Sequence, residues 1–198
     1  MDNHLEKYLE QLNGYIHADE LFTNEEWQAF QAIWQLFEVK RKTPITVPGE
    51  VEKYLYFVLD GSQRVYFNAD SGKEATLVFT YPHSFGGVLD SFLQQKPADY
   101  VFESLSKSVF LRASHADLMK LMDQYPAIDQ FIKQALYAVV SGLLERMKEL
   151  QCYSSEEKFK ALLKRSPHIL QVVPHKYLAN YLGIDPTNFS KLLNSVEV

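Results

Sequence analysis

The residues with the most suggestive chemistry lie near the C-terminus, where polar side chains recur at helical spacing. Asp185-Pro186 is a strong helix start, because Asp caps a helix and Pro fits its first position. The apolar positions that follow are Phe189, Leu192, Leu193 and Val196. Between them, hydroxyl, amide and ammonium groups point the other way and can bond base edges and phosphates in a DNA major groove. The predicted DNA contacts are Thr187, Asn188, Ser190, Lys191 and Asn194, together with Lys176 from the preceding helix.

Histidine and cysteine offer no comparable site. The six histidines include no pair at i+2 or i+4, so neither a His-x-His site nor a helical zinc pair is predicted. Cys152 is the single cysteine and cannot hold an iron-sulfur cluster, so we expect it to act as a small hydrophobe. Nucleophile-elbow, phosphate-loop and dinucleotide fingerprints are absent. We therefore expect no catalytic residue, no metal site and no enzymatic activity.

The elements that must position the C-terminal groups begin with two predicted helices. The first carries Leu5, Tyr8, Leu9 and Leu12, and Gly14 is expected to end it. The second begins at the capping box Thr23-x-x-Glu26, with Phe22 as its staple. Its predicted apolar stripe is Trp27, Phe30, Trp34 and Phe37, which we interpret as a packing face.

From Val39 to Leu111 the pattern changes to short β-rich runs separated by Gly, Pro, Asn and Asp. The runs are Tyr54 to Leu59, Arg64 to Asn68, Ala75 to Tyr81 and Ser108 to Leu111. Turn chemistry follows at Pro48-Gly49-Glu50, Asp60-Gly61-Ser62 and Asn68 to Gly72. This spacing predicts a sandwich or barrel of about six or more strands.

Two helices are expected after the strands. Asp117 can cap a short one, and Pro126 starts a much longer one that runs to about Gln151. Its apolar seam, close to a coiled-coil repeat, is Ile132, Leu136, Val139, Leu143, Met147 and Leu150. We interpret the seam as a dimer interface; the alternative is a helix packed along its own barrel.

The C-terminal region is predicted to be all helical. Ser154-x-x-Glu157 is a capping box, and Pro174 can begin a helix that Gly183 ends just before Asp185-Pro186. Two short helices joined by a Gly-containing turn make a helix-turn-helix, although two ordinary helices of a small bundle would look the same. No strand pair follows the last helix, so we expect no winged extension.

Composition is compatible with one large or two small domains. The chain has 198 residues, of which 46% are hydrophobic and 23% charged, so it can bury a core. Residues 1 to 150 carry 14 Lys and Arg against 21 Asp and Glu, a net of −7, whereas residues 151 to 198 carry 6 against 4, a net of +2. A polyanion would therefore meet the C-terminal end. With one cysteine, no basic-apolar leader and no membrane span, we expect a cytoplasmic protein.

Several strings resemble the Crp/Fnr family of bacterial transcription regulators, over essentially the whole chain. They are Val47-Pro48-Gly49-Glu50, Leu55 to Gly61, Ser71 to Glu74, Phe85-Gly86 and Tyr177 to Pro186, the last in a Bacteroidetes-like form. The resemblance implies an α+β fold: a cyclic-nucleotide-binding-type jelly-roll barrel with flanking helices (1–116), a dimerisation helix (117–151) and a helix-turn-helix domain (152–198). It further implies a homodimer, a palindromic DNA operator, a small-molecule effector and RNA polymerase as a possible partner.

The family's phosphate-binding cassette corresponds to the segment from Phe85 to Tyr100. The candidate ligand-binding residues there are Phe85, Gly86, Gly87, Val88, Lys96, Pro97, Ala98 and Asp99. Cyclic-AMP binders carry Glu where this chain has Gly87, and Arg where it has Pro97 or Ala98. Lys96 is a point charge without the bidentate fork of Arg, and Asp99 repels phosphate. We therefore expect no cyclic-AMP binding of the family's usual kind and name no other cofactor.

Three functions remain open on this evidence. The favoured one is a dimeric DNA-binding regulator whose barrel senses an effector. The second is a ligand-sensing or protein-interaction module that keeps the fold but has weak or lost DNA contacts, since Lys191 is the one basic residue of the last helix. The third, a β-barrel enzyme, lacks metal and nucleophile motifs.

Overall fold

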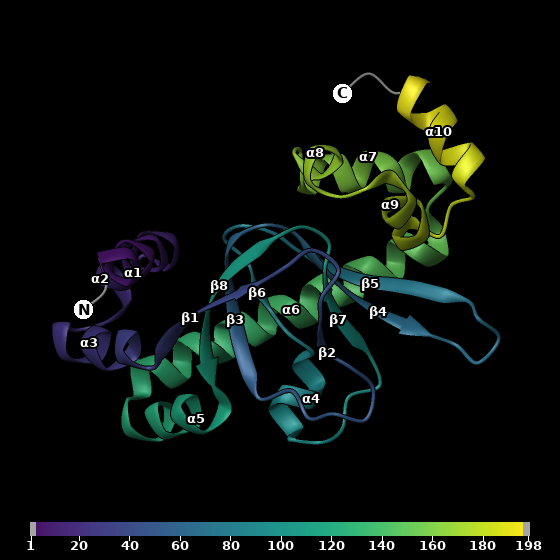
Figure 1. The fold of residues 1–198 in the computed structure, drawn as a ribbon. Helices are drawn as coiled ribbons and strands as arrows, with labels where there is room; N and C mark the ends of the chain where they lie inside the picture. The colour runs from purple at the N-terminus through teal and green to yellow at the C-terminus, as the bar shows by residue number, and fades with distance from the viewer. Residues whose placement is uncertain (1–2, 196–198) are drawn as a thin grey trace. The chain divides into compact units, whose positions relative to one another are not determined.

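The computed structural model describes residues 3–195 and divides into two compact units. The first comprises Met1–Val65 and Phe79–Ala135, and the second comprises Tyr66–Val78 and Leu136–Val198. Each unit is described by itself below (Figure 1). None of the helices within residues 3–195 is both long and apolar enough to cross a membrane.

The first unit starts with the helices α1 (Asn3–Ile16), α2 (Ala18–Leu21) and α3 (Asn24–Ala32). The prediction that Gly14 ends the first helix is wrong, because α1 continues for two further residues to Ile16. Leu12 and Ile16 are both buried, and this burial offsets the roughly 1 kcal/mol that Gly costs inside a helix. The Thr23 and Glu26 capping box is confirmed, with both reciprocal hydrogen bonds formed.

The predicted aromatic helix stripe is also partly wrong. Trp34 and Phe37 lie on strand β1 (Trp34–Val39), which pairs antiparallel with β8 (Ser108–Ser114) along its whole length. Although Trp34 is on a strand, it still packs edge-on against Phe30 of α3, with ring centroids 5.6 Å apart. Six residue pairs with β8 stabilise this segment as a strand.

The predicted jelly-roll barrel is confirmed as two four-stranded sheets. One has the order β1-β8-β3-β6 and the other β2-β7-β4-β5 (Figure 1). The remaining strands are β2 (Pro44–Thr46), β3 (Tyr54–Asp60), β4 (Gln63–Asn68), β5 (Glu74–Thr80), β6 (Phe85–Gly86) and β7 (Val101–Ser104). The core lies between the sheets, where side chains of both meet: Val39, Tyr56, Val58, Val65, Phe102 and Phe110.

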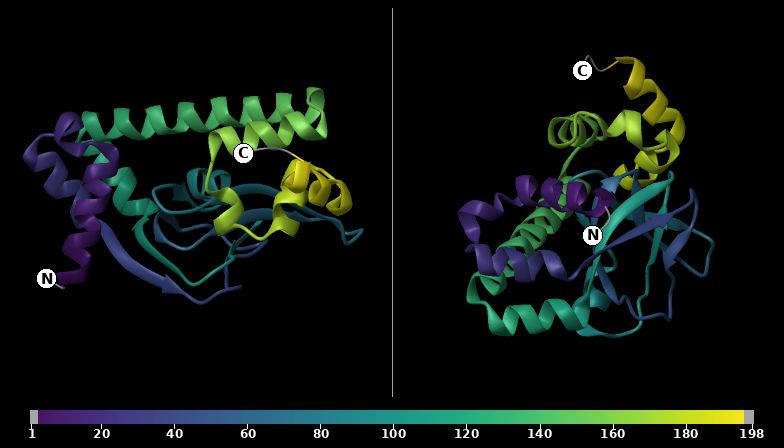
Figure 2. Two further views of the ribbon diagram at one scale, coloured as in Figure 1. Left: turned by 90° about the horizontal axis from the view of Figure 1, so that it is seen from above. Right: turned by 60° about the vertical axis from the view of Figure 1, so that its left-hand side comes forward.

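Three helices follow or interrupt the strands. They are α4 (Leu89–Gln94), α5 (His115–Gln124) and α6 (Pro126–Cys152). The N-cap of α5 is Ser114, whose hydroxyl accepts the amide of Asp117 at 3.1 Å, so the prediction that Asp117 caps it is wrong. Figure 2 shows α6 as one continuous helix, and its 27 residues correspond to about 40 Å.

In the second unit the C-terminal residues form α7 (Ser155–Arg165), α8 (Ile169–Val172), α9 (His175–Leu182) and α10 (Pro186–Ser195). The Ser154 capping box is confirmed, whereas Pro174 is the N-cap of α9 and not its first helical residue. Gly183 ends α9 at φ +65°, a conformation that favours glycine. The small core is closed by Phe159 and Phe189, whose rings meet edge to face at 5.5 Å.

Candidate functional site

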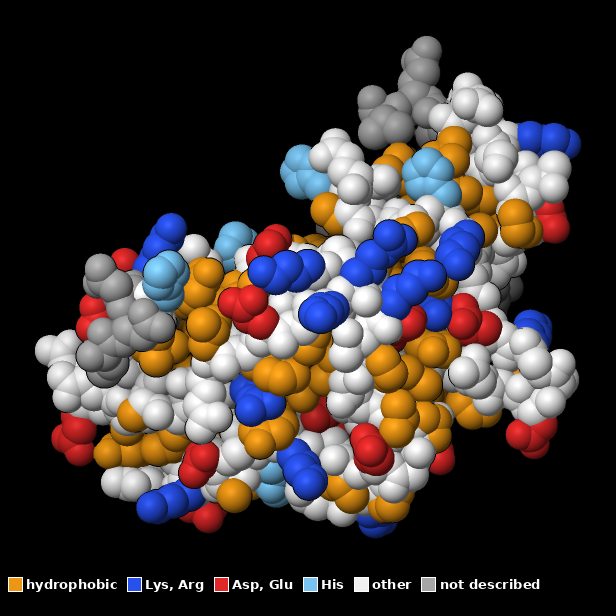
Figure 3. Space-filling view, viewed as in Figure 1, with side chains coloured by type: hydrophobic (Ala, Val, Ile, Leu, Met, Phe, Trp, Pro, Cys, Tyr) orange, Lys and Arg blue, Asp and Glu red, His pale blue; other side chains and the backbone are white. Residues whose placement is uncertain are grey.

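The last helix presents a polar face opposite its buried one. Phe189 and Leu192 are buried in the second unit, and Leu193 is partly buried, whereas Val196 lies outside the described residues. The residues predicted to contact DNA are all exposed: Thr187, Asn188, Ser190, Lys191, Asn194 and, on α9, Lys176. Over α10 the space-filling view shows mainly uncharged side chains (Figure 3). The exposed α10 residues thus lie on the helix surface not buried by Phe189 and Leu192, and this surface carries little charge.

Local hydrogen bonds fix the orientation of this helix. The Asp185 carboxylate accepts the amide of Thr187 at 2.8 Å, which confirms the predicted N-cap. Ser190 and Asn194 each donate a side-chain hydrogen bond to a backbone carbonyl one turn earlier. Lys191 forms no ion pair within residues 3–195, so its ammonium group is available to a partner.

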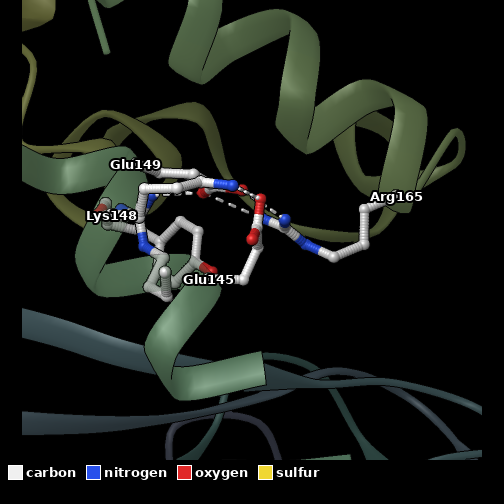
Figure 4. A network of polar contacts seen from close by, with 6 residues as sticks. Glu145, Lys148, Glu149 and Arg165 are labelled. Atoms are coloured by element: carbon white, nitrogen blue, oxygen red, sulfur yellow. Dashed lines mark hydrogen bonds and ion pairs between the residues drawn. The ribbon is translucent and has the colours of Figure 1, made fainter. Parts of the chain in front are cut away.

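A buried carboxylate joins α6 to the helices that follow it. Glu149 is 1% exposed and forms ion pairs with Arg165 at 2.6 Å (Figure 4) and with Arg146 at 3.0 Å. Arg146 also donates a hydrogen bond to the backbone carbonyl oxygen of Tyr181, and its guanidinium carbon lies 4.0 Å from the centre of the Tyr181 ring. Burial alone would raise the pKa of Glu149, but the hydrogen bonds from Arg165 and Arg146 outweigh it and hold the pKa below its usual value. This cluster holds α7 and α9 on the end of α6.

The second half of α6 carries an unusual apolar surface. Seven large apolar side chains on it are between 41% and 62% exposed: Tyr137, Val139, Val140, Leu143, Leu144, Met147 and Leu150. Four of the six predicted seam residues belong to this set, whereas Ile132 is buried within the first unit and Leu136 is half-buried. A contiguous strip of this kind marks an interaction surface more often than a solvated one.

The predicted ligand residues of the barrel fall into separate environments. Phe85 packs on Phe57 at 5.3 Å, Gly86 pairs with Tyr56 across the sheet, and Ala98 is buried and bonded through its backbone to Gly49 and Glu50. Lys96, Pro97 and Asp99 are exposed, and the Lys96 ammonium contacts Gln94 at 3.3 Å. The structure thus places Lys96 in solvent and Val88 in the core.

An internal carboxylate occupies the neighbourhood of Gly87 and Val88. The Val88 amide donates to Glu52 Oε2 at 3.4 Å, and Gly87 has φ +119° with its missing Cβ 3.5 Å from the same oxygen. Thr46 donates to Oε2 at 2.6 Å, and the Tyr54 amide and Tyr56 hydroxyl donate to Oε1 at 3.2 and 3.4 Å. Burial raises the pKa of Glu52, while the Thr46 hydroxyl and the Tyr54 and Val88 amides lower it. The Val88 amide, one of the cassette donors that could bind an anion, is therefore already bonded to Glu52.

Metal-binding chemistry is not assembled in the described part of the chain. Among residues 3–195, no three His, Cys, Asp or Glu side chains are grouped so that they could hold a metal ion. Cys152 is exposed at the end of α6, whereas the sequence analysis expected a small hydrophobe.

The comparison with protein families finds a match over the barrel and α5. The cyclic nucleotide-binding domain model matches residues 36–125. The match covers less than half of the chain and shows what this part of it is similar to. No curated protein matches the sequence of the whole chain.

Solved structures extend the likeness to most of the chain. FixK2 from Bradyrhizobium japonicum has a TM-score of 0.71 at 16% identity, covering 82% of this chain and 83% of its own. A transcriptional regulator described as Crp/Fnr family, from Eubacterium rectale, has a TM-score of 0.69 at 15% identity and covers 91% and 86%. The chain has the Crp/Fnr fold. The catabolite activator protein of Thermus thermophilus shares the Crp/Fnr fold with a TM-score of 0.55 at 22% identity, covering 88% and 83%.

Within this Crp/Fnr fold, the sequence analysis missed two charged residues inside the barrel. Glu52 lies two residues before Tyr54, and Arg112 lies two residues after Phe110. Side chains alternate along a strand, so Arg112 on β8 shares a face with Phe110, whereas Glu52 precedes β3 and is buried beside Tyr56. A charged residue in register with an inward aromatic run is the signal that could have identified them.

Proposed function

We propose that this chain is a homodimeric DNA-binding transcription regulator whose barrel senses an effector. The observation that carries the proposal is the exposed polar face of α10 on a helix whose other face is buried by Phe189 and Leu192. This is the arrangement by which a recognition helix offers side chains to a major groove. RNA polymerase would be a further partner of the DNA-bound dimer.

The apolar strip of α6 supplies the proposed dimer interface. Two copies related by a twofold axis would bury Val139, Leu143, Met147 and Leu150 against one another. The axis would repeat α10 at two half-sites, so the operator would be an inverted repeat. The Glu149 cluster would transmit a change in α6 to the following helices, because Glu149 binds Arg165 of α7 and its partner Arg146 donates to Tyr181 of α9.

Effector control would work through unequal binding to two dimer arrangements. In the second unit, the Asn180 amide of α9 accepts the Thr76 amide at 2.6 Å and donates to the Glu74 carbonyl at 2.8 Å. This fork ties α9 to the edge of β5, so a displaced β4–β5 hairpin would move α9. Cyclic AMP bound in the family's usual way is not the proposed effector, because the Val88 amide donates to Glu52 and residues 85–100 include no Arg.

A second candidate is a sensing or interaction module with weak or lost DNA contacts. The observation that favours it is the low charge of α10, on which Lys191 is the one basic residue. Fewer phosphate contacts mean lower affinity and a shallower dependence on salt.

Lys191→Glu separates the two candidates. We expect it to weaken binding to a random-sequence duplex at low salt roughly tenfold or more, since each half-site exchanges a cation for an anion beside phosphates. Fluorescence anisotropy of a labelled duplex measures the affinity, and sedimentation confirms an unchanged dimer. The control is Lys120→Glu on α5, exposed and equal in charge change. Equal affinity for both variants would support the module without DNA contacts.

A further inference from the structure

The barrel contains an arginine that forms no ion pair with any residue from 3 to 195. Arg112 lies on β8 two residues from the buried Phe110 and directly opposite Tyr56 of β3. Its guanidinium carbon lies 4.3 Å from the centre of the Phe37 ring and 4.4 Å from that of Tyr54. Two aromatic rings therefore hold the planar group in one orientation, which leaves its hydrogen-bonding edges for another partner.

No protein group within residues 3–195 satisfies this guanidinium. Its Nε is fully buried and has no hydrogen-bond acceptor, and no carboxylate forms an ion pair with it. The other inward arginines behave differently: Arg64 binds Glu103 at 3.0 Å and Arg146 binds Glu149 at 3.0 Å. Burying a charged donor without an acceptor is costly, and native proteins rarely do so without a ligand, water or functional reason.

The nearby carboxylate does not fill this role. Glu52 accepts hydrogen bonds from Thr46, Tyr56 and the amides of Tyr54 and Val88, so its two oxygens are already used. Tyr56 lies between the two charged groups. Burial raises its pKa most, Glu52 raises it further, and Arg112 lowers it. The carboxylate and the guanidinium thus act on the same hydroxyl without pairing with each other.

The core next to the Arg112 strand is apolar, and Arg112 itself is half-buried. The buried core beside it includes Tyr56, Phe102 and Phe110, and four partly buried side chains pack on that core at its edge. These four are Phe37, Ile45, Tyr54 and Tyr100. One fixed guanidinium in aromatic and aliphatic walls matches a ligand with an apolar body and a single anionic head.

We propose that the barrel binds a small organic anion, a carboxylate or phosphate monoester with an apolar body, through the guanidinium of Arg112. This inference deepens the proposed function by naming the chemical class of the effector and a residue that holds it. Phe37 and Tyr54 position the guanidinium, and the head group accepts its free N–H donors. The site differs from the predicted cassette, since Lys96 is exposed and Val88 is bonded to Glu52.

The test is a titration of the full chain with benzoate, phenyl phosphate and the neutral isostere benzamide. The arginine Nε–H resonances report binding, and loss of one resonance in Arg112→Met assigns it. We expect the Arg112 resonance to shift with either anion, at an affinity at least tenfold above that for benzamide. Tighter binding of phenyl phosphate would identify a phosphate head group, and tighter binding of benzoate a carboxylate.

Two variants and one control decide the role of Arg112. Arg112→Met should lose the preference for anions and should be at least as thermally stable as the parent, because an unpaired charge has been removed. Arg112→Lys keeps the positive charge but loses the two-pronged hydrogen-bond geometry of the guanidinium, so it should bind benzoate and phenyl phosphate several-fold more weakly. Arg41→Met, an exposed arginine near the barrel's β1–β2 turn, should bind like the parent.

The outcomes that would overturn the proposal are equally direct. Benzamide bound as tightly as benzoate, or anion binding unchanged in both Arg112 variants, would show that the guanidinium holds no anion. The titration contains no DNA. Its failure would therefore leave the Lys191→Glu result standing, and absence of DNA binding would leave the Arg112 resonance shift intact.

Discussion

Leu143→Glu is expected to turn the proposed dimer into monomers. Leu143 is 50% exposed in one chain and lies at the middle of the apolar strip of α6, between Val139 and Met147. In a twofold dimer each substitution counts twice, so two carboxylates would be buried against an apolar partner. We expect the dissociation constant to rise at least 1,000-fold, about 4 kcal/mol. Sedimentation velocity across a concentration series measures it.

The matched control is Gln134→Glu. Gln134 is exposed on the same helix, and its position is roughly opposite to that of the seam residues around the helix axis. It adds the same charge and should leave the dimer intact. A Leu143→Glu protein that sediments as an unchanged dimer would show that the interface lies elsewhere and would remove the basis for paired half-sites.

Glu149→Ala should loosen the C-terminal helices without unfolding the barrel. The substitution leaves Arg146, whose side chain is 10% exposed, without its carboxylate. Breaking a buried pair typically costs 3–5 kcal/mol; we expect about 3 because Arg165 is 43% exposed and can turn to water. Glu145→Ala is the control, since Glu145 pairs with Lys148 at the surface and should cost under about 1 kcal/mol (Figure 4).

Hydrogen exchange is the appropriate measurement for this effect. Both tryptophans, Trp27 and Trp34, belong to the first unit, so tryptophan fluorescence does not report on α7 to α10. Amide protection in residues 155–195 should fall by the stated free energy, while protection of β3 stays unchanged. Equal protection in the Glu149 and Glu145 variants would contradict the stabilising role of this cluster.

The same carboxylate predicts a pH dependence. Because Arg165 and Arg146 hold the pKa of Glu149 below its usual 4.5, its contribution is complete above that pH and is lost as the pH falls through the lowered value. Protection of α7 to α10 should therefore decline as the pH falls below 4.5 and through the lowered pKa. The Glu149→Ala protein should lose this part of the decline.

The accuracy of the sequence analysis depends partly on the range of the interactions involved. Most local signals succeeded: the Thr23 and Ser154 capping boxes, the Asp185 cap and the Pro126 helix start are all present, whereas the Gly14 stop and the Asp117 cap were wrong. Trp34 failed because an aromatic spacing of three and four continues from α3 into β1, and pairing with β8, more than 70 residues away, decides the conformation there. The residue preferences of a short segment contain no information about a strand that pairs with it from so far away in the sequence.

The candidate sites show the same limit. Periodicity was sufficient to place Thr187, Lys191 and Asn194 on an exposed face, because one helix determines it. The relation of Glu52 to Val88, and of Arg112 to Phe37, depends on strands that are distant in sequence. The resemblance directed attention to the cassette, whereas the unpaired charge lies on β8, outside it.

The measurement that tests the central claim most directly is selection of binding sites from random duplex DNA by the purified protein at low salt. Parallel arms would contain no addition, cyclic AMP, or benzoate with phenyl phosphate. We predict an enriched inverted repeat with half-sites about one helical turn apart, unaffected by cyclic AMP. Absence of enrichment in every arm, from a protein that sediments as a dimer, would contradict a DNA-binding regulator and favour the sensing or interaction module.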